Sequence, residues 1–343
     1  MDIMEKIYAR AAEDPQRIAF PEATDEKILQ AARECCDKGM IVPVLVGNKA
    51  EIRKAAEGFG ISLDGMEYFD TTDEAALSAL ISQYAPMNEM LSEKALGKRA
   101  ARDPMFPALY LLAVGKVDAM FAGMTHTTGD VIQAGMLIIG LEDGIITPSS
   151  IGIAKIPGFN GSEGDLLCFG DSAVCVNPSP EELASIALAA CDTVKALLEW
   201  DPRCAMLSYS TDGSAESPLV DKVREALKIA RETRPEYKID GEFQLDAAID
   251  PRIAAKKVRR ESEVAGKANI VIWPDLNVGN IGVKLVQFFS HADAYGPLLQ
   301  GFRKIVCDCS RSAPVSELVG NIAMAAVRAQ SQKKFLSFTE EAK

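Results

Sequence analysis

The sequence predicts an α/β protein of two domains, built on a mainly parallel sheet with helices on both faces. Two observations support this class: short β-rich runs alternate with amphipathic helices, and the chain has 343 residues. Alternating strands and helices are typical of parallel sheets, because each connection returns across one face of the sheet. A single hydrophobic core stops growing at roughly 250–300 residues, so a longer chain is expected to divide into two domains.

The first half of the chain carries the clearest alternation. Apolar residues recur on one face in the helical segments and form short continuous runs in the strand segments. The predicted strands are 17–21, 41–47 and 117–123, and the predicted helices are 25–38, 48–56 and 105–115. The polar, helix-prone segment 73–102 is expected to form a mobile flank or lid.

The alternation of predicted strands and helices gives way to successive strands near residue 145, where we place a domain boundary. A long helix is expected to begin at Pro180, because proline and the two glutamates after it suit the first turn of a helix. A last helix is expected over 315–329. Further strands are expected at 145–156, 166–176, 205–209, 239–243, 270–274 and around Ile305. The pattern alone leaves open whether the C-terminal stretch returns to the first domain.

The composition excludes several classes of protein. The formal net charge is −12 and no Lys- or Arg-rich run is present, so neither nucleic acid nor an anionic membrane is an expected partner. Eight cysteines occur without a C-x-x-C pair, and only His126 and His291 could join them, so we expect reduced thiols and no metal site. We find no signal-peptide pattern and no apolar run that could span a bilayer, which predicts a cytoplasmic protein.

Four polar segments that contain glycine or serine follow predicted strands. The first is 123–130, in which His126, Thr127 and Thr128 precede a predicted helix. Hydroxyl and backbone N–H groups at the start of a helix form a ready site for an anion. The alternative is structural, with a threonine as the helix cap and His126 as a satisfied polar residue of the core.

The second segment, 207–215, again ends a strand with small hydroxyl residues and glycine. Ser210, Thr211, Gly213 and Ser214 resemble a phosphate-cradling loop in their chemistry, although the Walker pattern is absent. An ordinary strand-to-helix turn with Ser214 as the cap explains the segment equally well.

The third segment, 273–282, stops a strand at proline. Gly279 and Gly282 permit close approach of the backbone, and Asn280 offers both a donor and an acceptor. The segment is expected to be a loop, either a plain Gly/Asn turn or a ligand-binding loop.

The fourth segment, 308–317, places Ser310 and Arg311 just before the last helix. Arginine suits bidentate recognition of phosphate or carboxylate. Glu317, in the first turn of that helix, is either a capping acid or a general base. Four such segments predict a cleft for a phosphate-bearing ligand. Neither a G-x-S-x-G elbow nor a Rossmann fingerprint is present, so we expect polarisation rather than redox chemistry.

These segments, in this order, resemble the phosphate acetyltransferase (phosphotransacetylase) and phosphate butyryltransferase family. The resemblance covers nearly the whole chain, and its weak stretch is 73–102. Further matching motifs are D-G-E-x-Q-x-D-A-A at 240–248, G-K-A-N at 266–269, P-D-L and G-N-I within 274–281, G-P-x-L-Q-G at 296–301 and D-x-S-R at 308–311.

The resemblance implies two three-layer α/β/α domains with a cleft between them, similar to isocitrate and isopropylmalate dehydrogenases. It also implies that the last segment returns to the first domain, which gives domain 1 as 1–145 plus 300–343 and domain 2 as 146–299. The family transfers an acyl group between coenzyme A and inorganic phosphate, giving an acyl phosphate such as acetyl phosphate. Its members are commonly homodimers. Coenzyme A is then a substrate, and no cofactor is expected.

The same resemblance suggests roles for individual residues. Glu317 stands where the family has an aspartate proposed as the base for the coenzyme A thiol. Ser310 would hydrogen-bond the oxyanion, and Arg311 would bind the phosphate or acyl phosphate. Attack by the thiolate would be direct, without a covalent enzyme intermediate. Gln133, also expected to contact substrate, takes the place of a family arginine, and the segment 87–90 lacks a second one.

Those two departures keep a second function open, that of a catalytically weakened paralogue that binds coenzyme A or acyl phosphate as a sensor or partner subunit. A charge-assisted contact is worth roughly 1.5–3 kcal/mol, so the loss of two could abolish phosphate binding. A third possibility, from fold analogy alone, is a decarboxylating dehydrogenase of the isocitrate type. The arginine cluster and metal-binding aspartates of that class are not recognisable in the sequence.

Overall fold

The computed structural model describes residues 2–341, with side chains described through Lys334. The chain divides into two compact units. The first holds the chain up to Gly140 and again from Phe302 onward, and the second holds Leu141–Gly301. From the sequence we place the corresponding boundaries at 145/146 and 299/300. The chain leaves the first unit once and returns to it, so the second unit is one continuous segment.

The first unit is built on a parallel sheet with the strand order β11-β4-β1-β2-β3. Its strands are β1 (Gln16–Phe20), β2 (Ile41–Gly47), β3 (Glu67–Asp70), β4 (Ala119–Phe121) and β11 (Ile305–Cys307). The apolar runs predict all of these except β3. That strand escapes the sequence pattern because its residues are only half-buried and form no apolar run.

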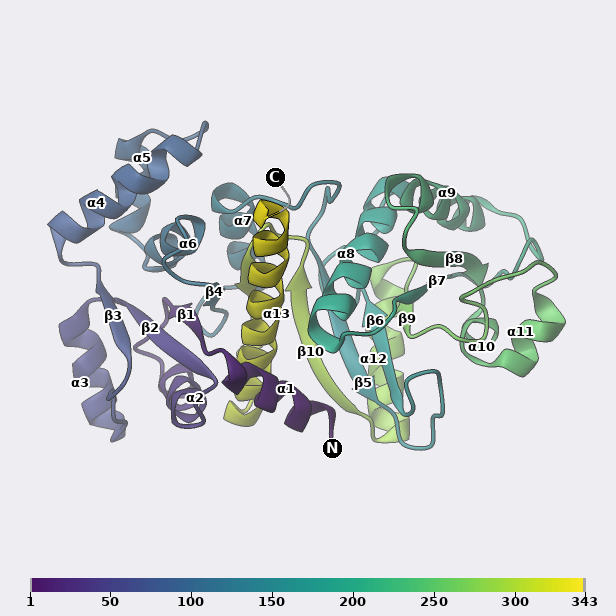
Figure 1. The fold of residues 1–343 in the computed structure, drawn as a ribbon, viewed down its shortest axis with the longest axis horizontal. Coiled ribbons are helices and arrows are strands. Elements are labelled where there is room, and N and C mark those ends of the chain that lie inside the picture. Colours follow the sequence, from purple (N-terminus) through teal and green to yellow (C-terminus); the bar gives the residue numbers. More distant parts are fainter. Residues whose placement is uncertain (1, 342–343) are drawn as a thin grey trace. The chain divides into compact units, whose positions relative to one another are not determined.

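Helices cover both faces of this sheet (Figure 1). They are α1 (Ile3–Glu13), α2 (Glu26–Asp37), α3 (Lys49–Phe59), α4 (Glu74–Tyr84), α5 (Glu93–Ala100), α6 (Met105–Ala113), α7 (Thr128–Ile138) and α13 (Val315–Glu341). Helices α2, α3 and α13 pack on one face, and α6 and α7 pack on the other. The predicted α/β class and its layers are therefore confirmed for this unit.

The segment 73–102 is packed rather than free-standing. It forms α4, a short 3-10 turn and α5, and Leu80 and Tyr84 of α4 are buried. The Tyr84 ring stacks on Tyr110 with 4.9 Å between ring centroids, and its hydroxyl donates to the carbonyl of Ile138 at 2.9 Å. The expectation of a lid is wrong for α4, because the polar composition conceals these few large side chains that anchor it.

The second unit is built on a mixed sheet with the strand order β10-β5-β6-β9-β7-β8. Its strands are β5 (Ser149–Lys155), β6 (Leu166–Gly170), β7 (Arg203–Leu207), β8 (Lys238–Phe243), β9 (Ile270–Ile272) and β10 (Asp293–Gln300). β5 runs antiparallel to both of its neighbours, and the other neighbouring pairs are parallel. β10 is not predicted from the sequence, because Gly296-Pro297 interrupts its pattern and its register shifts there.

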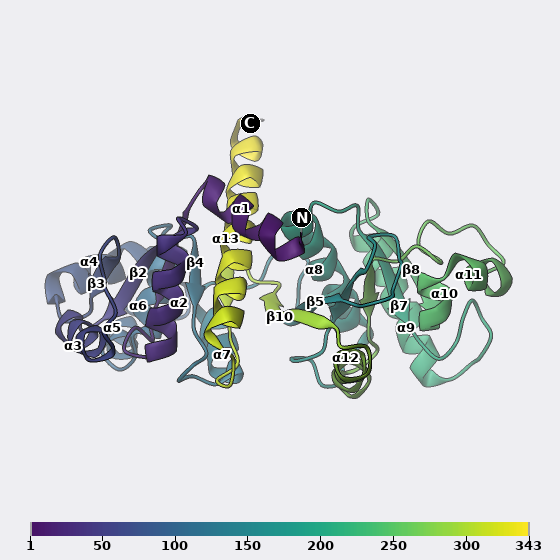
Figure 2. The ribbon, with the colours of Figure 1, turned by 90° about the horizontal axis from the view of Figure 1, so that it is seen from below.

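The helices of the second unit also lie on both faces of the sheet. They are α8 (Pro180–Leu198), α9 (Pro218–Thr233), α10 (Leu245–Ile249), α11 (Pro251–Lys257) and α12 (Leu276–Ser290). Helices α8 and α9 pack on one face, and α10 and α12 pack on the other; Figure 2 shows α8 and α12 on opposite sides. A buried cluster around Phe169, Phe243 and Trp273 forms the core beneath α10 and α12.

The sequence predicts a loop at 273–282, and this prediction is wrong. Most of the segment is the start of α12. Asp275 caps this helix by accepting from the N–H of Val278 at 3.1 Å. The two glycines do allow close approach, but it is the approach of the helix to Trp273 and not of the backbone to a ligand. A Cβ at Gly279 would stand 2.9 Å from Trp273 Cδ1, and one at Gly282 would stand 3.0 Å from Trp273 Cη2.

Candidate functional site

The strands β1, β4 and β11 are parallel neighbours, so their carboxyl ends meet at one edge of the first sheet. Glu22, residues 123–127 and residues 308–311 follow these strands and lie close together. Gly123 has φ +118°, and a Cβ there would stand 2.5 Å from the backbone N and 2.6 Å from the O of Cys309. Only glycine fits at this position, which lets the loops after β4 and β11 touch.

A buried carboxylate, Glu22, holds the loop after β4. Glu22 is 4% exposed and accepts the backbone N–H groups of Met124, Thr125 and His126 at 2.8, 2.8 and 2.9 Å. Burial alone would raise the pKa of Glu22, but hydrogen bonds from His126 and Thr125 outweigh it and lower that pKa to about 2. The ionised carboxylate therefore fixes three consecutive residues of the loop.

His126 lies between two carboxylates. Its Nδ1 is 2.8 Å from Glu22 Oε1, and its Nε2 is 3.0 Å from Asp103 Oδ2. Hydrogen bonds to Asp103 and to Glu22 raise the pKa of His126 to about 10, against the opposing effect of burial. The ring is an imidazolium at neutral pH, with both N–H groups already donated. Asp103 also accepts from the N–H of Met105 at 2.8 Å, so His126 ties the loop to the start of α6.

The two threonines after His126 have different partners. Thr127 is the N-cap of α7 and shares a capping box with Asp130, with 2.7 Å from Thr127 Oγ1 to Asp130 Oδ2. Thr128 donates its hydroxyl to Asp308 Oδ2 at 2.5 Å and so joins the loops after β4 and β11. The N–H groups of Thr128 and Gly129, the first of α7, have no partner among the described residues. They are donors that an anion can use.

Asp308 lies at the centre of this arrangement. Burial raises the pKa of Asp308 to about 6, although the hydrogen bond from Thr128 opposes the rise. The second carboxyl oxygen, Oδ1, is buried and has no hydrogen-bond partner among the described residues. Asp308 therefore holds its proton more readily than an ordinary aspartate, and it lies directly before the Ser310-Arg311 pair.

Ser310 and Arg311 are exposed on the turn between β11 and α13. The turn is braced from α2, where Lys27 Nζ donates to the carbonyls of Ala313 at 3.0 Å and Arg311 at 3.5 Å. The guanidinium of Arg311 makes no hydrogen bond or direct ion pair among the described residues. Its charge nevertheless reaches the start of α7, because it contributes, after the hydrogen bonds from Thr127, to lowering the pKa of Asp130.

Glu317 lies in the first turn of α13 and is half-buried. Burial raises the pKa of its carboxyl. No backbone N–H donates to this carboxylate among the described residues, so the capping role considered from the sequence is not seen. A carboxylate with a raised pKa and no fixed partner is suited to accept a proton.

A cavity of about 830 Å³ opens beside α7 and brings together two of the residues singled out from the sequence, His126 and Gln133. Arg99 and Asp103 line the same space. Gln133 is exposed, and within the described part of the chain the guanidinium of Arg99 donates only to the carbonyl of Ala95, at 3.4 Å. This cavity lies wholly within the first unit.

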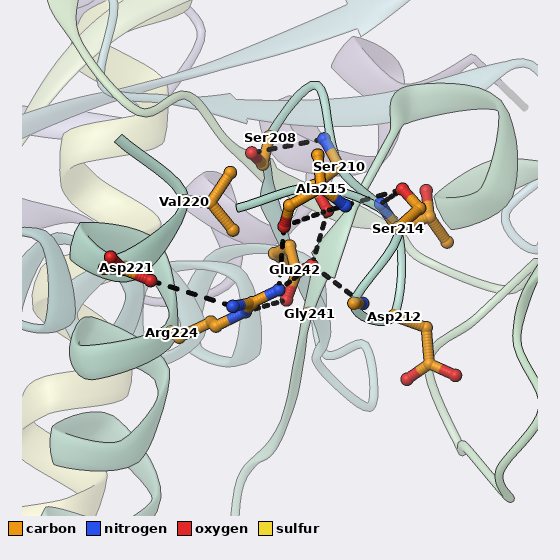
Figure 3. Close-up of polar contacts among 12 residues, drawn as sticks. Ser208, Ser210, Asp212, Ser214, Ala215, Val220, Asp221, Arg224, Gly241 and Glu242 are labelled. Atoms are coloured by element: carbon orange, nitrogen blue, oxygen red, sulfur yellow. Dashed lines mark hydrogen bonds and ion pairs between the residues drawn. The ribbon is translucent and has the colours of Figure 1, made fainter. Parts of the chain in front are cut away.

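In the second unit, the loop after β7 closes on a buried carboxylate, as Figure 3 shows. Ser210 Oγ and the N–H of Gly213 donate to Glu242 Oε1 at 2.7 and 3.0 Å. Arg224 completes the network, with Nε 3.0 Å from Glu242 Oε2 and Nη2 3.1 Å from the carbonyl of Ala215. Burial alone would raise the pKa of Glu242, but Arg224 and Ser210 outweigh it and lower that pKa to about 2.

This network changes the interpretation of the loop. Ser210 is 0% exposed and Thr211 is 3% exposed. The backbone N–H groups of 210–215 all donate within the protein, so the loop does not offer the free donors of a phosphate cradle. Gly213 and Ser214 are exposed and are the groups that the loop presents to a ligand.

Gly279 and Asn280 lie in the first turns of α12, next to the segment that follows β6. Asn280 Nδ2 donates to the carbonyl of Ser172 at 3.4 Å. The neighbouring Asp171 is 3% exposed and accepts three consecutive backbone N–H groups, from 173–175, at 2.7–3.2 Å. Gly279 is buried against this turn, whereas Asn280 is exposed beside it.

The carboxylates that organise these loops are not among the site residues predicted from the sequence. Glu22 and Asp171 each follow the end of a buried strand, and an acid in that position is the signal that could have found them. Glu242 lies in the D-G-E motif but carries no signal of its own role. Asp103 and Arg224 carry no signal of this kind in the sequence, because their partners are distant in sequence or are set by helix packing.

Among the described side chains, no cluster of three or more His, Cys, Asp or Glu residues could hold a metal ion. No described helix is both long enough and apolar enough to cross a membrane.

Comparison with known proteins gives consistent results. A family model described as phosphate acetyl/butaryl transferase matches residues 2–326. The phosphate acetyltransferase of Clostridium acetobutylicum is 38% identical over 333 residues, which cover 96% of this chain and 99% of that protein.

Solved structures agree with the sequence comparison. A phosphotransacetylase from Streptococcus pyogenes superposes with a TM-score of 0.87 at 31% identity, covering 96% of this chain and 98% of that one. A 4-hydroxythreonine-4-phosphate dehydrogenase from Klebsiella pneumoniae superposes with a TM-score of 0.54 at 12% identity, covering 92% and 100%. This second likeness concerns the fold alone and agrees with the dehydrogenase-like fold class expected from the sequence.

Proposed function

Because the chain belongs to the phosphate acetyl/butaryl transferase family, we propose that it catalyses the reversible transfer of a short acyl group between coenzyme A and inorganic phosphate. The observation that carries this proposal is the grouping of an unpaired guanidinium, a serine hydroxyl and free helix N–H groups at the carboxyl ends of β4 and β11. These are the groups that a bound phosphate and a developing oxyanion require.

In the proposed mechanism, Arg311 holds the phosphate of the acyl phosphate through its planar guanidinium. The thiolate of coenzyme A attacks the acyl carbonyl carbon and forms the new carbon–sulfur bond. Ser310 donates to the oxyanion that develops on the carbonyl oxygen. The carbon–oxygen bond to phosphate then breaks, inorganic phosphate leaves, and the thioester remains. The attack is direct, and coenzyme A enters as a substrate rather than as a resident cofactor.

Glu317 is the proposed base for this step. A thiol has a reference pKa near 8.5, so it needs only modest help to lose its proton. Burial raises the pKa of Glu317 toward that of the thiol. The carboxylate is therefore a better proton acceptor at neutral pH. In the reverse direction, the same carboxyl returns the proton to the leaving thiolate.

We also propose substrate contacts for Thr128, through its backbone N–H, and for the exposed Gly213, Ser214 and Asn280. Ser210, Thr211 and Thr127 are assigned a supporting role in this proposal, because their hydroxyls are already committed within the protein. For a phosphate acyltransferase without a membrane or nucleic-acid partner, we propose the cytoplasm as its location.

A homodimer is the proposed assembly. α12 presents five large apolar side chains that are between 43% and 81% exposed: Val278, Ile281, Leu285, Phe288 and Phe289. An exposed apolar face of this kind marks an interface in a protein that is otherwise rich in charge. The proposed partner is a second copy of this chain.

The proposed activity is tested by following thioester absorbance when acetyl-, propionyl- or butyryl-coenzyme A is mixed with the protein and phosphate or arsenate. We expect loss of the thioester signal. Ser310→Ala serves as the matched control and should reduce kcat by roughly 10²- to 10³-fold, as removal of one oxyanion donor does elsewhere. Folded protein that consumes none of the three thioesters would contradict the proposal.

A further inference from the structure

The cavity beside α7 has one apolar wall that the mechanism above does not use. Met105 and Phe106 of α6 form one part of it, and Ile132, Met136 and Leu137 of α7 form the other. The volume of about 830 Å³ lies within the range of about 300–1,000 Å³ that is usual for small-molecule sites. An acetyl group fills only a small part of such a space.

The α7 side of the cavity is one continuous face of the helix. Gly129, Ile132, Gln133 and Met136 line it at the spacing i, i+3, i+4 and i+7. A helix rises about 1.5 Å per residue, so this face extends roughly 10 Å from Gly129 to Met136. Its first turn is polar and carries unpartnered N–H groups, and its far end is apolar.

The polar end of the cavity adjoins the proposed phosphate site. Asp130 lines the cavity, and the positive charge of Arg311 contributes to lowering the pKa of Asp130. Thr128, one residue before the cavity lining begins on α7, is hydrogen-bonded to Asp308 in the loop that carries Arg311. For an acyl phosphate held by Arg311, we therefore infer that the acyl chain extends from this polar end along α7.

The cavity is lined by two carboxylates, Asp103 and Asp130, and by two cations, Arg99 and His126. Asp103 accepts from His126 and from the N–H of Met105, and Asp130 accepts from Thr127, so both carboxylates have partners. Gln133, at the middle of the α7 face, is uncharged. A neutral amide at this point adds no ion that would have to be desolvated when the chain passes Gln133.

We propose that this cavity is the acyl-chain site, and that it selects straight-chain acyl groups of three to five carbons over acetyl. The proposal rests on the proposed function, and it adds the substrate class. Burial of each further methylene is worth roughly a fourfold gain in kcat/KM. Butyryl substrates, which carry two more methylenes, should therefore exceed acetyl substrates by roughly fifteenfold.

The test is a comparison of kcat/KM for acetyl-, propionyl- and butyryl-coenzyme A in the phosphate-dependent reaction. Met136→Trp and Ile132→Trp fill the apolar end, and the 42% exposure of Met136 makes the larger ring tolerable for folding. Both should lower the ratio of butyryl to acetyl kcat/KM at least tenfold. Met90→Trp is the matched control: Met90 is 70% exposed and does not line the cavity, so this ratio should stay as in the unaltered protein.

Phe106→Ala provides the inverse change, since it enlarges the cavity, and it should shift the preference toward longer chains. A preference of the unaltered protein for acetyl would overturn the proposal. So would an equal loss for all three thioesters in Met136→Trp, because the cavity would then hold a part common to every substrate. No turnover of any thioester would instead contradict the proposed function.

Discussion

Arg311 and His126 are both cations at neutral pH, but their surroundings give them different uses. Both ring nitrogens of His126 donate to carboxylates, whereas the guanidinium of Arg311 has no direct partner among the described residues. A paired cation contributes rigidity, and an unpaired one contributes affinity for an anion. The two residues therefore divide structural and binding roles within one short edge of the sheet.

Arg311→Lys should raise the KM for phosphate at least tenfold and change kcat less. Lysine keeps the charge but loses the planar, bidentate geometry, and a charge-assisted contact is worth roughly tenfold to a hundredfold in affinity. The measurement is the initial rate of thioester loss across a phosphate titration. Arg53→Lys, on α3, is the matched control and should leave KM as it is. An unchanged KM in Arg311→Lys would exclude this residue from phosphate binding.

His126→Gln should destabilise the protein in a pH-dependent way. The pKa of His126 is about 10 in the folded state, above an unfolded value of about 6.5, so its stabilising effect is complete below pH 6.5 and is lost as pH rises toward 10. The free energy of unfolding, from urea denaturation between pH 5 and 10, should therefore differ most from that of the unaltered protein at the acidic end. A difference that stays constant over this range would show that the ring is not held as an imidazolium.

At the scale of elements, the contact between the loops after β4 and β11 depends on Gly123. Gly123→Ala should lower the free energy of unfolding by more than about 2 kcal/mol, because a methyl group there overlaps the backbone of Cys309 and the positive φ adds strain. The matched control is Gly39→Ala, which shares a positive φ of +65° but has nothing within 4 Å of the added Cβ. Equal effects of both substitutions on chemical denaturation would show that backbone strain alone matters.

The sequence predicts most strands, because buried parallel strands leave continuous apolar runs. It misses β3 and β10, whose residues are half-buried or interrupted by Gly296-Pro297. It also assigns α12 to a loop, since two glycines and an asparagine suggest a turn. Those glycines instead let the helix pack on Trp273, a tertiary contact that no local pattern displays.

In the candidate site too, the sequence predicts the features that depend on neighbouring residues and misses those that depend on residues distant in the chain. The motifs around Thr128 and Arg311 can be recognised locally, because strand ends and helix starts have characteristic residues. Their buried supports, such as Glu22 and Glu242, cannot, because their partners are set by which strands become neighbours. The four predicted site segments also separate into two pairs, one pair beside each sheet, which the order along the chain does not reveal.

At the scale of the whole molecule, the apolar face of α12 should govern assembly. Phe288→Glu combined with Phe289→Glu should convert a dimer into a monomer in sedimentation velocity, because two charges would then oppose burial of this face. Phe59→Glu, at a residue 42% exposed on α3, is the matched control and should leave the sedimentation coefficient as it is. A monomeric unaltered protein at micromolar concentration would contradict the proposed assembly.

The return of the chain to its first unit has a consequence for synthesis. Leu141–Gly301 is synthesised before β11, and until then the sheet of the first unit lacks this edge strand, which pairs with the free side of β4. The nascent chain should therefore complete its second unit first and hold an open edge beside β4 until the last segment emerges. Unpaired strand edges recruit other chains, so the late arrival of β11 leaves this edge exposed to aggregation during synthesis.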